Sequence, residues 1–132
     1  MAKKLLRLLG RSMESKWDYK LTQIANTDLE GIICYIAFDL ANPKAASDFM
    51  DKVSDTIENI RAFPKNGTPL SNMYMFRYDI RKKYIGNYIM YYYPDIDERT
   101  IYILRIVYAK KNMDVIVKEM EGLINIENKK LK

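Results

Sequence analysis

Basic and aromatic side chains supply most of the chemistry that the second half of this chain could perform. Seven bases lie in the predicted strands or just after the last of them: Arg77, Arg81, Lys82, Lys83, Arg105, Lys110 and Lys111. Seven tyrosines are interleaved with them: Tyr84, Tyr88, Tyr91, Tyr92, Tyr93, Tyr102 and Tyr108. Bases held by a sheet can neutralise phosphates, and tyrosines can stack on unpaired nucleobases. The pattern favours contact with a nucleic acid and indicates catalysis only weakly.

Several kinds of site are missing from the sequence. There is no histidine, the side chain most suited to proton transfer near neutral pH. There is no Cys-x-x-Cys pair, no His/Cys cluster and no phosphate-binding glycine motif. We therefore expect neither a metal nor a cofactor. The single cysteine, Cys34, cannot form an internal disulfide, so we expect a reducing compartment, the cytoplasm. Its expected role is that of a small, buried hydrophobic side chain on a helix.

The net charge of +5 is divided unevenly along the chain. Residues 26–60 carry two bases and seven acids, a net charge of −5, whereas residues 61–111 carry ten bases and four acids, a net charge of +6. Such a division predicts an acidic or polyanionic partner on one side of the molecule. The alternative is solvated surface charge without a partner.

Three runs of β-branched and aromatic residues predict strands over residues 74–85, 88–93 and 100–108. The first two are separated by Gly86-Asn87, a dipeptide typical of tight hairpins. A polar loop over residues 94–99 separates the second from the third. The last run is apolar on both faces except at Arg105, which is typical of an interior strand covered on both sides. A long basic side chain in such a strand requires a partner or a function.

The first half of the chain predicts a short strand over residues 17–24 and then two helices. Thr27 and Glu30 are spaced as a capping box at the start of the first helix, and Thr22 is an alternative cap. That helix should end near Asn42, and Pro43 suits the first turn of the second. The second helix has an apolar stripe, and Pro64 should end it. Its stripe residues are Ala46, Phe49, Met50, Val53, Ile57 and Ile60. A third helix is predicted over residues 113–126.

This order of elements predicts an α+β domain: a four-stranded, mostly antiparallel sheet packed on an N-terminal helical hairpin, with a C-terminal helix. Residues 1–12 are expected to be a basic N-terminal extension, with Met13 as an alternative start. Residues 13–118 are expected to form the domain, and residues 119–132 a polar C-terminal tail. No apolar run approaches the ~20 residues that a membrane-spanning helix needs.

Over roughly residues 19–117 the chain resembles the RelE/ParE family of toxins from bacterial type II toxin–antitoxin modules. The segments that carry the resemblance are LTQIANTDLEGIICYI, LANPKAASDF, ENIRAFPKNG, DIRKKYIGNYIMYY and IYILRIVYAKKN, in this order and spacing. The resemblance implies a small sheet against a helical hairpin and a cognate antitoxin, encoded nearby, that wraps the toxin.

The family divides by target. The RelE-like branch cuts messenger RNA in the ribosome with basic residues and a tyrosine on the sheet, and the ParE-like branch poisons DNA gyrase without being a nuclease. By position, Arg81 matches the family's arginine on the second strand. Lys110 and Lys111 match the basic pair that ends the fourth strand. Tyr108 falls where many relatives have histidine or tyrosine, and Asn112 replaces a frequent aspartate.

The first function that we expect is ribosome-dependent cleavage of messenger RNA, which blocks translation. The resemblance implies catalytic roles for Arg81, Tyr108, Lys110 and Lys111, and we expect Lys83, on the same face as Arg81, to act with them. The basic, aromatic sheet predicts substrate-binding roles for Arg77, Lys82, Tyr84, Tyr91 and Arg105. The alternatives are a ParE-like, non-enzymatic inhibitor of DNA gyrase, which the long hairpin favours, and a decayed toxin that only binds its antitoxin. Attack by an RNA 2′-OH needs a base, an acid and stabilisation of charge on the phosphate. Because Arg81 stays protonated, Lys83, Lys110 or Tyr108 would need a lowered pKa to act as the base.

Overall fold

The computed structural model describes residues 16–70, 78–111 and 113–131, so the expected extension over residues 1–12 and the site candidate Arg77 lie outside the described residues. The strands are β1 (Asp18–Leu21), β2 (Thr68–Pro69), β3 (Arg81–Ile85), β4 (Tyr88–Asp95) and β5 (Thr100–Tyr108). The helices are α2 (Gln23–Cys34), the π-helix η1 (Tyr35–Asp39), α3 (Pro43–Ala62) and α4 (Met113–Leu131). The α+β class is confirmed.

The sheet has five strands in the order β1-β5-β4-β3-β2, and this corrects the expected number of four. The additional strand is β2, which comes from a segment that looked like a loop and pairs antiparallel with Arg81 and Lys82 of β3. β1 runs parallel to β5, whereas β2, β3, β4 and β5 are joined by antiparallel pairs. The strand expected over residues 88–93 continues to Asp95, because Pro94 and Asp95 still pair with β5. The strand over residues 100–108 is confirmed.

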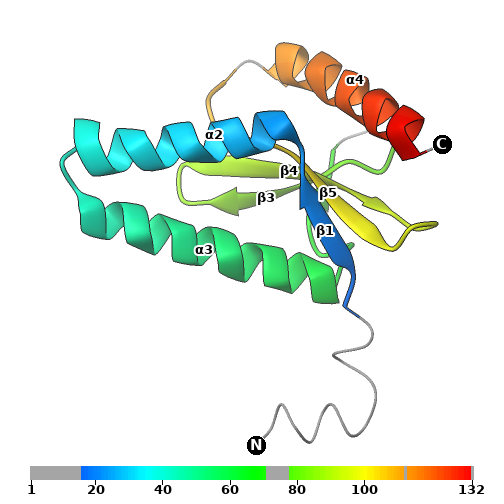
Figure 1. Cartoon of the computed structure of the whole chain (residues 1–132), viewed down its shortest axis with the longest axis horizontal. Helices are drawn as coiled ribbons and strands as arrows, with labels where there is room; N and C mark the ends of the chain where they lie inside the picture. The colour runs from blue at the N-terminus through cyan, green and yellow to red at the C-terminus, as the bar shows by residue number, and fades with distance from the viewer. Residues whose placement is uncertain (1–15, 71–77, 112, 132) are drawn as a thin grey trace, which may run out of the picture.

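Both faces of the sheet are covered by helices (Figure 1). On one face, α2 and α3 form the predicted hairpin and pack on β3, β4 and β5 in the first core cluster. On the other face, Ile116, Met120 and Ile124 of α4 pack on β4 and β5 in a second cluster. Residues 100–107 are all buried between the two layers, as expected for an interior strand. Because Arg105 lies in this strand, its guanidinium must find its partners inside the protein.

A β-bulge interrupts the pairing of β4 with β5. Tyr92 pairs with Ile103, but its neighbour Tyr91 pairs with Arg105, so Leu104 is an extra residue on β5. Residues on a strand normally alternate between the faces of the sheet. The extra residue shifts this alternation by one position, so that Leu104 and Arg105 both belong to the face that α4 covers.

The start of α2 differs from the capping box expected at Thr27 and Glu30. The N-cap is Thr22, whose Oγ1 accepts a hydrogen bond from the Ala25 N–H at 3.0 Å. Thr27 lies inside the helix, where its hydroxyl donates to the Gln23 carbonyl. β1 accordingly ends at Leu21 and is shorter than the strand expected over residues 17–24. Thr22 fits the cap because β1 delivers it directly to the edge of β5.

The turn between α2 and α3 was predicted correctly, with Asn42 as the N-cap of α3 and Pro43 in its first turn. Before this turn α2 widens into the π-helix η1. Cys34, expected to be buried, is exposed because Ile32, Ile33 and Ile36 take the inward-facing positions around it. Met50 of the predicted α3 stripe is also exposed.

α4 is longer than predicted and reaches Leu131. The expected domain boundary at residue 118 falls inside this helix, and Met120 and Ile124 beyond it are buried in the core. Among the described residues, no helix combines the length and the apolar character that crossing a membrane requires.

Candidate functional site

The pairing of the strands sorts the expected site residues onto different faces of the sheet. Directly opposed residues of antiparallel strands share a face. Arg81 is opposite Tyr92 and Lys83 is opposite Met90, and both of these partners belong to the core beneath the helical hairpin. Arg81 and Lys83 therefore share the hairpin face.

Lys82 and Tyr84 lie on the opposite face of β3. Their partners across the ladder, Tyr91 and Ile89, belong to the core that α4 covers. The Lys82 Nζ lies 5.4 Å from the centre of the Tyr84 ring, in a cation–π contact. Because the sheet separates this pair from Arg81 and Lys83, the basic residues of β3 do not form one patch.

Arg81 holds the loop that follows α3. Its Nε donates to Asp79 Oδ2 at 3.1 Å, and its Nη1 donates to the carbonyls of Lys65 and Gly67, both at 2.9 Å. A charged donor that satisfies two backbone carbonyls and a carboxylate is fixed in place. The arginine that resembles the family's catalytic residue thus forms a structural clamp in this chain.

The Tyr92 hydroxyl also binds this loop, on the same face of the sheet as Arg81. Its hydroxyl donates to the Pro64 carbonyl at 2.7 Å and accepts from the Gly67 N–H at 2.8 Å. A Cβ at Gly67 would lie 2.5 Å from the Tyr92 hydroxyl oxygen, so this close approach requires glycine. Burial raises the pKa of Tyr92, and the hydrogen bond from Gly67 opposes this effect.

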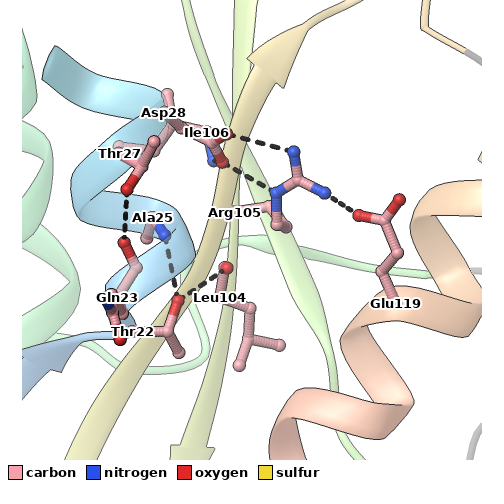
Figure 2. Close-up of polar contacts among 9 residues, drawn as sticks. All are labelled: Thr22, Gln23, Ala25, Thr27, Asp28, Leu104, Arg105, Ile106 and Glu119. Carbon is pink, nitrogen blue, oxygen red and sulfur yellow. Dashed lines mark hydrogen bonds and ion pairs between the residues drawn. The ribbon is translucent and has the colours of Figure 1, made fainter. Parts of the chain in front are cut away.

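Arg105 bridges α2 and α4 around the free edge of β5, beyond the end of β1 (Figure 2). Its Nε and Nη2 donate to the two carboxylate oxygens of Asp28, at 2.7 and 3.0 Å, and its Nη1 forms an ion pair with Glu119. The residue is only 6% exposed. The bulge explains this geometry, since it places Arg105 on the α4 face. The ion pairs supply the partners that an arginine in a buried strand needs.

Asp28 and Thr22 also bind backbone groups on the edge of β5 that extends beyond the end of β1. The Ile106 N–H donates to Asp28 Oδ2 at 3.0 Å, and the Thr22 hydroxyl donates to the Leu104 carbonyl at 3.0 Å (Figure 2). Side chains of α2 thus satisfy backbone groups that a neighbouring strand would otherwise pair. Arg105 and the equally buried Tyr91 are therefore part of the fold, and neither is at the surface where an RNA would bind.

The remaining candidates, Tyr108, Lys110 and Lys111, are exposed at the end of β5. Tyr108 and Lys111 line a groove of about 350 Å³ between α2 and the ends of β4 and β5. The other residues that line it are Thr27, Asp28, Gly31, Ile32, Tyr35, Tyr88, Ile106 and Val107. At this groove, two of the expected site residues meet a hollow of the described surface.

Three tyrosines surround this groove. The ring of Tyr88 contacts that of Tyr108 edge to face, with centroids 5.9 Å apart, and packs against Phe49 at 5.3 Å on its other side. Burial raises the pKa of Tyr88, and the nearby phenols of Tyr35 and Tyr108 raise it further. Tyr88 therefore stays protonated, so it can donate a hydrogen bond but is poorly suited to act as a base.

The five expected catalytic residues do not converge on one point. Arg81 is opposite Tyr92 on β4 and Tyr108 is opposite Tyr88, four residues earlier. With ~3.3 Å per residue and ~4.8 Å per strand, the Cα atoms of Arg81 and Tyr108 lie roughly 16 Å apart. The corresponding separation of Lys83 and Tyr108 is roughly 12 Å. One phosphate cannot contact Arg81 and Tyr108 together at this separation, because the hydrogen bonds of Arg81 also hold its side chain away from the groove.

Sequence reasoning missed the residues that the first helices contribute to the groove, namely Thr27 and Gly31 of α2 and Tyr35 of η1. A signal was available, because Gly31 interrupts the middle of a predicted helix and a glycine there needs a reason. Among the described residues, no group of three His, Cys, Asp or Glu side chains could hold a metal ion. The groove offers phenol hydroxyls and an ammonium, which suit the binding of a carboxylate or phosphate.

A helical hairpin on one face of a small mixed sheet is the arrangement that the sequence resemblance implied. The model of the ParE toxin family, described as the ParE toxin of the type II toxin–antitoxin system parDE, matches residues 19–113. The chain therefore belongs to the ParE toxin family. No curated protein matches the sequence significantly.

Two solved structures share the fold. A chain of the chromosomal ParDE toxin–antitoxin system from P. aeruginosa aligns with a TM-score of 0.58 and 16% identity, over 73% of this chain and 99% of the other. A chain of the RelBE2 toxin–antitoxin complex from Mycobacterium tuberculosis aligns with a TM-score of 0.50 and 19% identity, over 70% and 98%. At these identities the likeness concerns the fold, which both branches of the family share.

Proposed function

We propose that this protein is the toxin of a type II toxin–antitoxin module and that it arrests growth by binding DNA gyrase. A cognate antitoxin encoded nearby keeps it inactive, and both act in the cytoplasm. The observation that carries the toxin function is the match of the ParE family over residues 19–113, which includes the hairpin and all of β3, β4 and β5.

The arrangement of the basic residues supports a binding mechanism over a nuclease. Arg81 is occupied by Asp79 and two carbonyls, and Arg105 is occupied by Asp28 and Glu119. Cleavage of a phosphodiester requires charge stabilisation and proton transfer at the same phosphate. A nuclease built on Tyr108 and the two lysines beside it would lack the arginine. An inhibitor that holds its target through a surface has no such requirement.

Ribosome-dependent cleavage of messenger RNA remains the second candidate, and one observation favours it. Tyr108, Lys110 and Lys111 are exposed together at the end of β5, in the part of the chain that carries the net charge of +6. Lysines can contact the phosphates of a message, and the tyrosine can stack on a base. In this mechanism Lys110 would be the base, and Lys111 would stabilise charge on the phosphate.

Induction of the wild-type gene in a bacterial host tests the toxin function. Growth should stop, and co-expression of the neighbouring antitoxin gene should restore it. The arrested cells should show a DNA-damage response and gyrase trapped on DNA, with translated messages uncut. Unimpaired growth with the full-length, folded protein present would contradict the proposal and would identify a decayed toxin.

A further inference from the structure

We propose that Asn66-Gly67 is a site of spontaneous deamidation, and that the folded protein blocks the reaction by holding the Gly67 peptide between Tyr92 and Arg81. The reaction then proceeds only in molecules whose loop after α3, residues 64–67, has opened. This inference goes beyond the proposed function and does not depend on it, because it concerns a covalent change that the chain undergoes without a partner.

The sequence favours this reaction at one position. Of the asparagines in the chain, only Asn66 is followed by glycine. Asparagine is a thermally labile residue. Glycine lacks a Cβ, so it leaves the amide nitrogen that follows the asparagine open to reaction with the asparagine side chain.

The reaction needs water as its only co-reactant. The Gly67 nitrogen attacks Cγ of Asn66, so that an N–Cγ bond forms and the Cγ–Nδ2 bond breaks. The proton of the Gly67 N–H passes to the departing amide nitrogen, which leaves as ammonia. A water molecule then opens the cyclic imide at either of its two carbonyls and gives aspartate or isoaspartate. No step is an oxidation or a reduction.

The nitrogen that would attack is occupied in the folded protein. The Gly67 N–H donates to the Tyr92 hydroxyl oxygen at 2.8 Å, and Gly67 is buried. The Gly67 carbonyl accepts from Arg81 Nη1 at 2.9 Å, so the residue is held at both ends. A buried N–H with a hydrogen-bond partner is costly to release. The fold therefore immobilises the residue that makes this sequence reactive.

The side chain that would be attacked is held as well. The Asn66 Nδ2 donates to Oδ1 of Asn59 on α3, and the Asn66 N–H donates to the Phe63 carbonyl at 2.9 Å. Asn66 is exposed, so these hydrogen bonds, and not burial, fix its position. Because cyclisation expels Nδ2, the hydrogen bond to Asn59 is lost as the reaction proceeds.

The isoaspartate product does not fit the folded loop. It adds one methylene group to the backbone between residues 66 and 67. A Cβ built on Gly67 already lies 2.5 Å from the Tyr92 hydroxyl oxygen, so there is no space for a further atom beside this ring. The lengthened backbone cannot keep the hydrogen bonds of Gly67 to both Tyr92 and Arg81. Conversion to isoaspartate therefore makes an opening of the loop permanent.

The first test compares the folded and the unfolded full chain during incubation at one mildly alkaline pH. Peptide mapping measures isoaspartate at residue 66. In urea, where the hydrogen bonds of Gly67 are absent, the site should convert at least about ten-fold faster than in the folded protein, because protection requires the closed loop. Equal rates in the two states, or no conversion of Asn66 in urea, would overturn the proposal.

The second test removes one of the two contacts. Tyr92→Phe deletes the acceptor of the Gly67 N–H and keeps the ring, so the folded variant should convert at Asn66 at least about ten-fold faster than the folded wild type. The matched control is Tyr102→Phe. Tyr102 is also buried, but it belongs to the core that α4 covers, and its hydroxyl donates to Glu98 at 2.6 Å. This variant should convert within about two-fold of the wild-type rate.

Arg81→Ala decides the question if Tyr92→Phe does not fold, because it frees the Gly67 carbonyl and keeps the Tyr92 hydroxyl. It should also accelerate conversion at Asn66. A wild-type rate in folded Tyr92→Phe, or in folded Arg81→Ala where Tyr92→Phe does not fold, would overturn the protective role of these hydrogen bonds. None of these measurements uses the toxic activity, so a negative result would leave the proposed function intact.

Discussion

Arg105 and Asp28, 77 positions apart in the sequence, form a two-pronged ion pair that joins β5 to α2, with Nε–Oδ2 at 2.7 Å and Nη2–Oδ1 at 3.0 Å. Glu119 completes the arrangement from α4, so one guanidinium connects both helical layers with the strand between them. The side chains of Arg105 and Asp28 are 7% and 14% exposed. Geometry and burial therefore make this pair an element of the fold.

Replacement of Asp28 by alanine should destabilise the protein strongly. The change leaves the Arg105 charge buried without its bidentate partner and removes the acceptor of the Ile106 N–H. Loss of one member of a buried ion pair typically costs about 3–5 kcal/mol. Urea unfolding of Asp28→Ala against the wild type measures the change in the free energy of unfolding.

The exposed pair Lys44–Asp48 on α3 is the matched control. Since exposed pairs of this spacing contribute about 0.3–0.5 kcal/mol, Asp48→Ala should have little effect. Substitution of Arg105 by methionine together with Asp28→Leu should recover much of the lost stability. Equal, small effects of Asp28→Ala and Asp48→Ala would contradict a structural role for the buried pair.

Replacement of Arg81 by alanine distinguishes a structural role of this side chain from a catalytic one. It removes three hydrogen bonds and leaves the carbonyls of Lys65 and Gly67 without this donor, so we expect a loss of about 1–3 kcal/mol in the free energy of unfolding. Toxicity should fall only as far as the amount of folded protein falls. Unfolding curves and growth assays on the same variant check both parts. A variant of full stability and no toxicity would show that Arg81 acts on the target.

The pH dependence of stability should reveal the tyrosines of the core. Burial raises the pKa of Tyr92 above its ordinary value of 10.0, so the folded state holds this proton longer than the unfolded state does. The resulting stabilisation is fully present below the ordinary pKa and is lost as the pH rises through the folded value. The difference in stability between the wild type and Tyr92→Phe should therefore shrink as the pH rises above the ordinary pKa of 10.0. A difference that stays constant over this range would contradict the burial of a neutral phenol.

Removal of residues 1–12 should leave the domain folded. The Trp17 N–H donates to the Arg61 carbonyl, and β1 begins at Asp18, so the described fold starts after the expected extension. We expect the melting temperature to change by less than about 2 °C, which corresponds to about 0.5 kcal/mol for a chain of this size. Thermal unfolding of the shortened and full chains measures this, and a large drop would indicate that the extension is part of the core.

Local patterns predicted most of the elements, because each depends on neighbouring residues. Asn42-Pro43 marked the start of α3, Gly86-Asn87 marked the hairpin turn, and the apolar run over residues 100–108 marked the buried strand. β2 was not predicted, because it has only two residues and is recognised as a strand by its pairing with β3 alone. Thr22 was expected only as the alternative cap, since its choice depends on the Leu104 carbonyl, 82 positions away.

The candidate site could be predicted less well than the fold. The sequence identified bases and tyrosines on the strands, but their partners come from distant segments: Asp28 for Arg105, and Lys65 and Gly67 for Arg81. A sequence pattern cannot distinguish a base committed to a partner from one available to a ligand. The one-residue shift at Leu104, which moves Arg105 to the α4 face, has no local signal either.

A side-by-side assay with the purified wild-type toxin tests the central claim most directly. One reaction contains DNA gyrase, ATP and a relaxed plasmid, and the other contains a translation system programmed with a message that is read by primer extension. The account predicts blocked supercoiling with accumulation of cleaved plasmid in the first reaction, and no new RNA ends in the second. Full gyrase activity together with toxin-dependent cuts in the translated message would contradict it and would establish the nuclease.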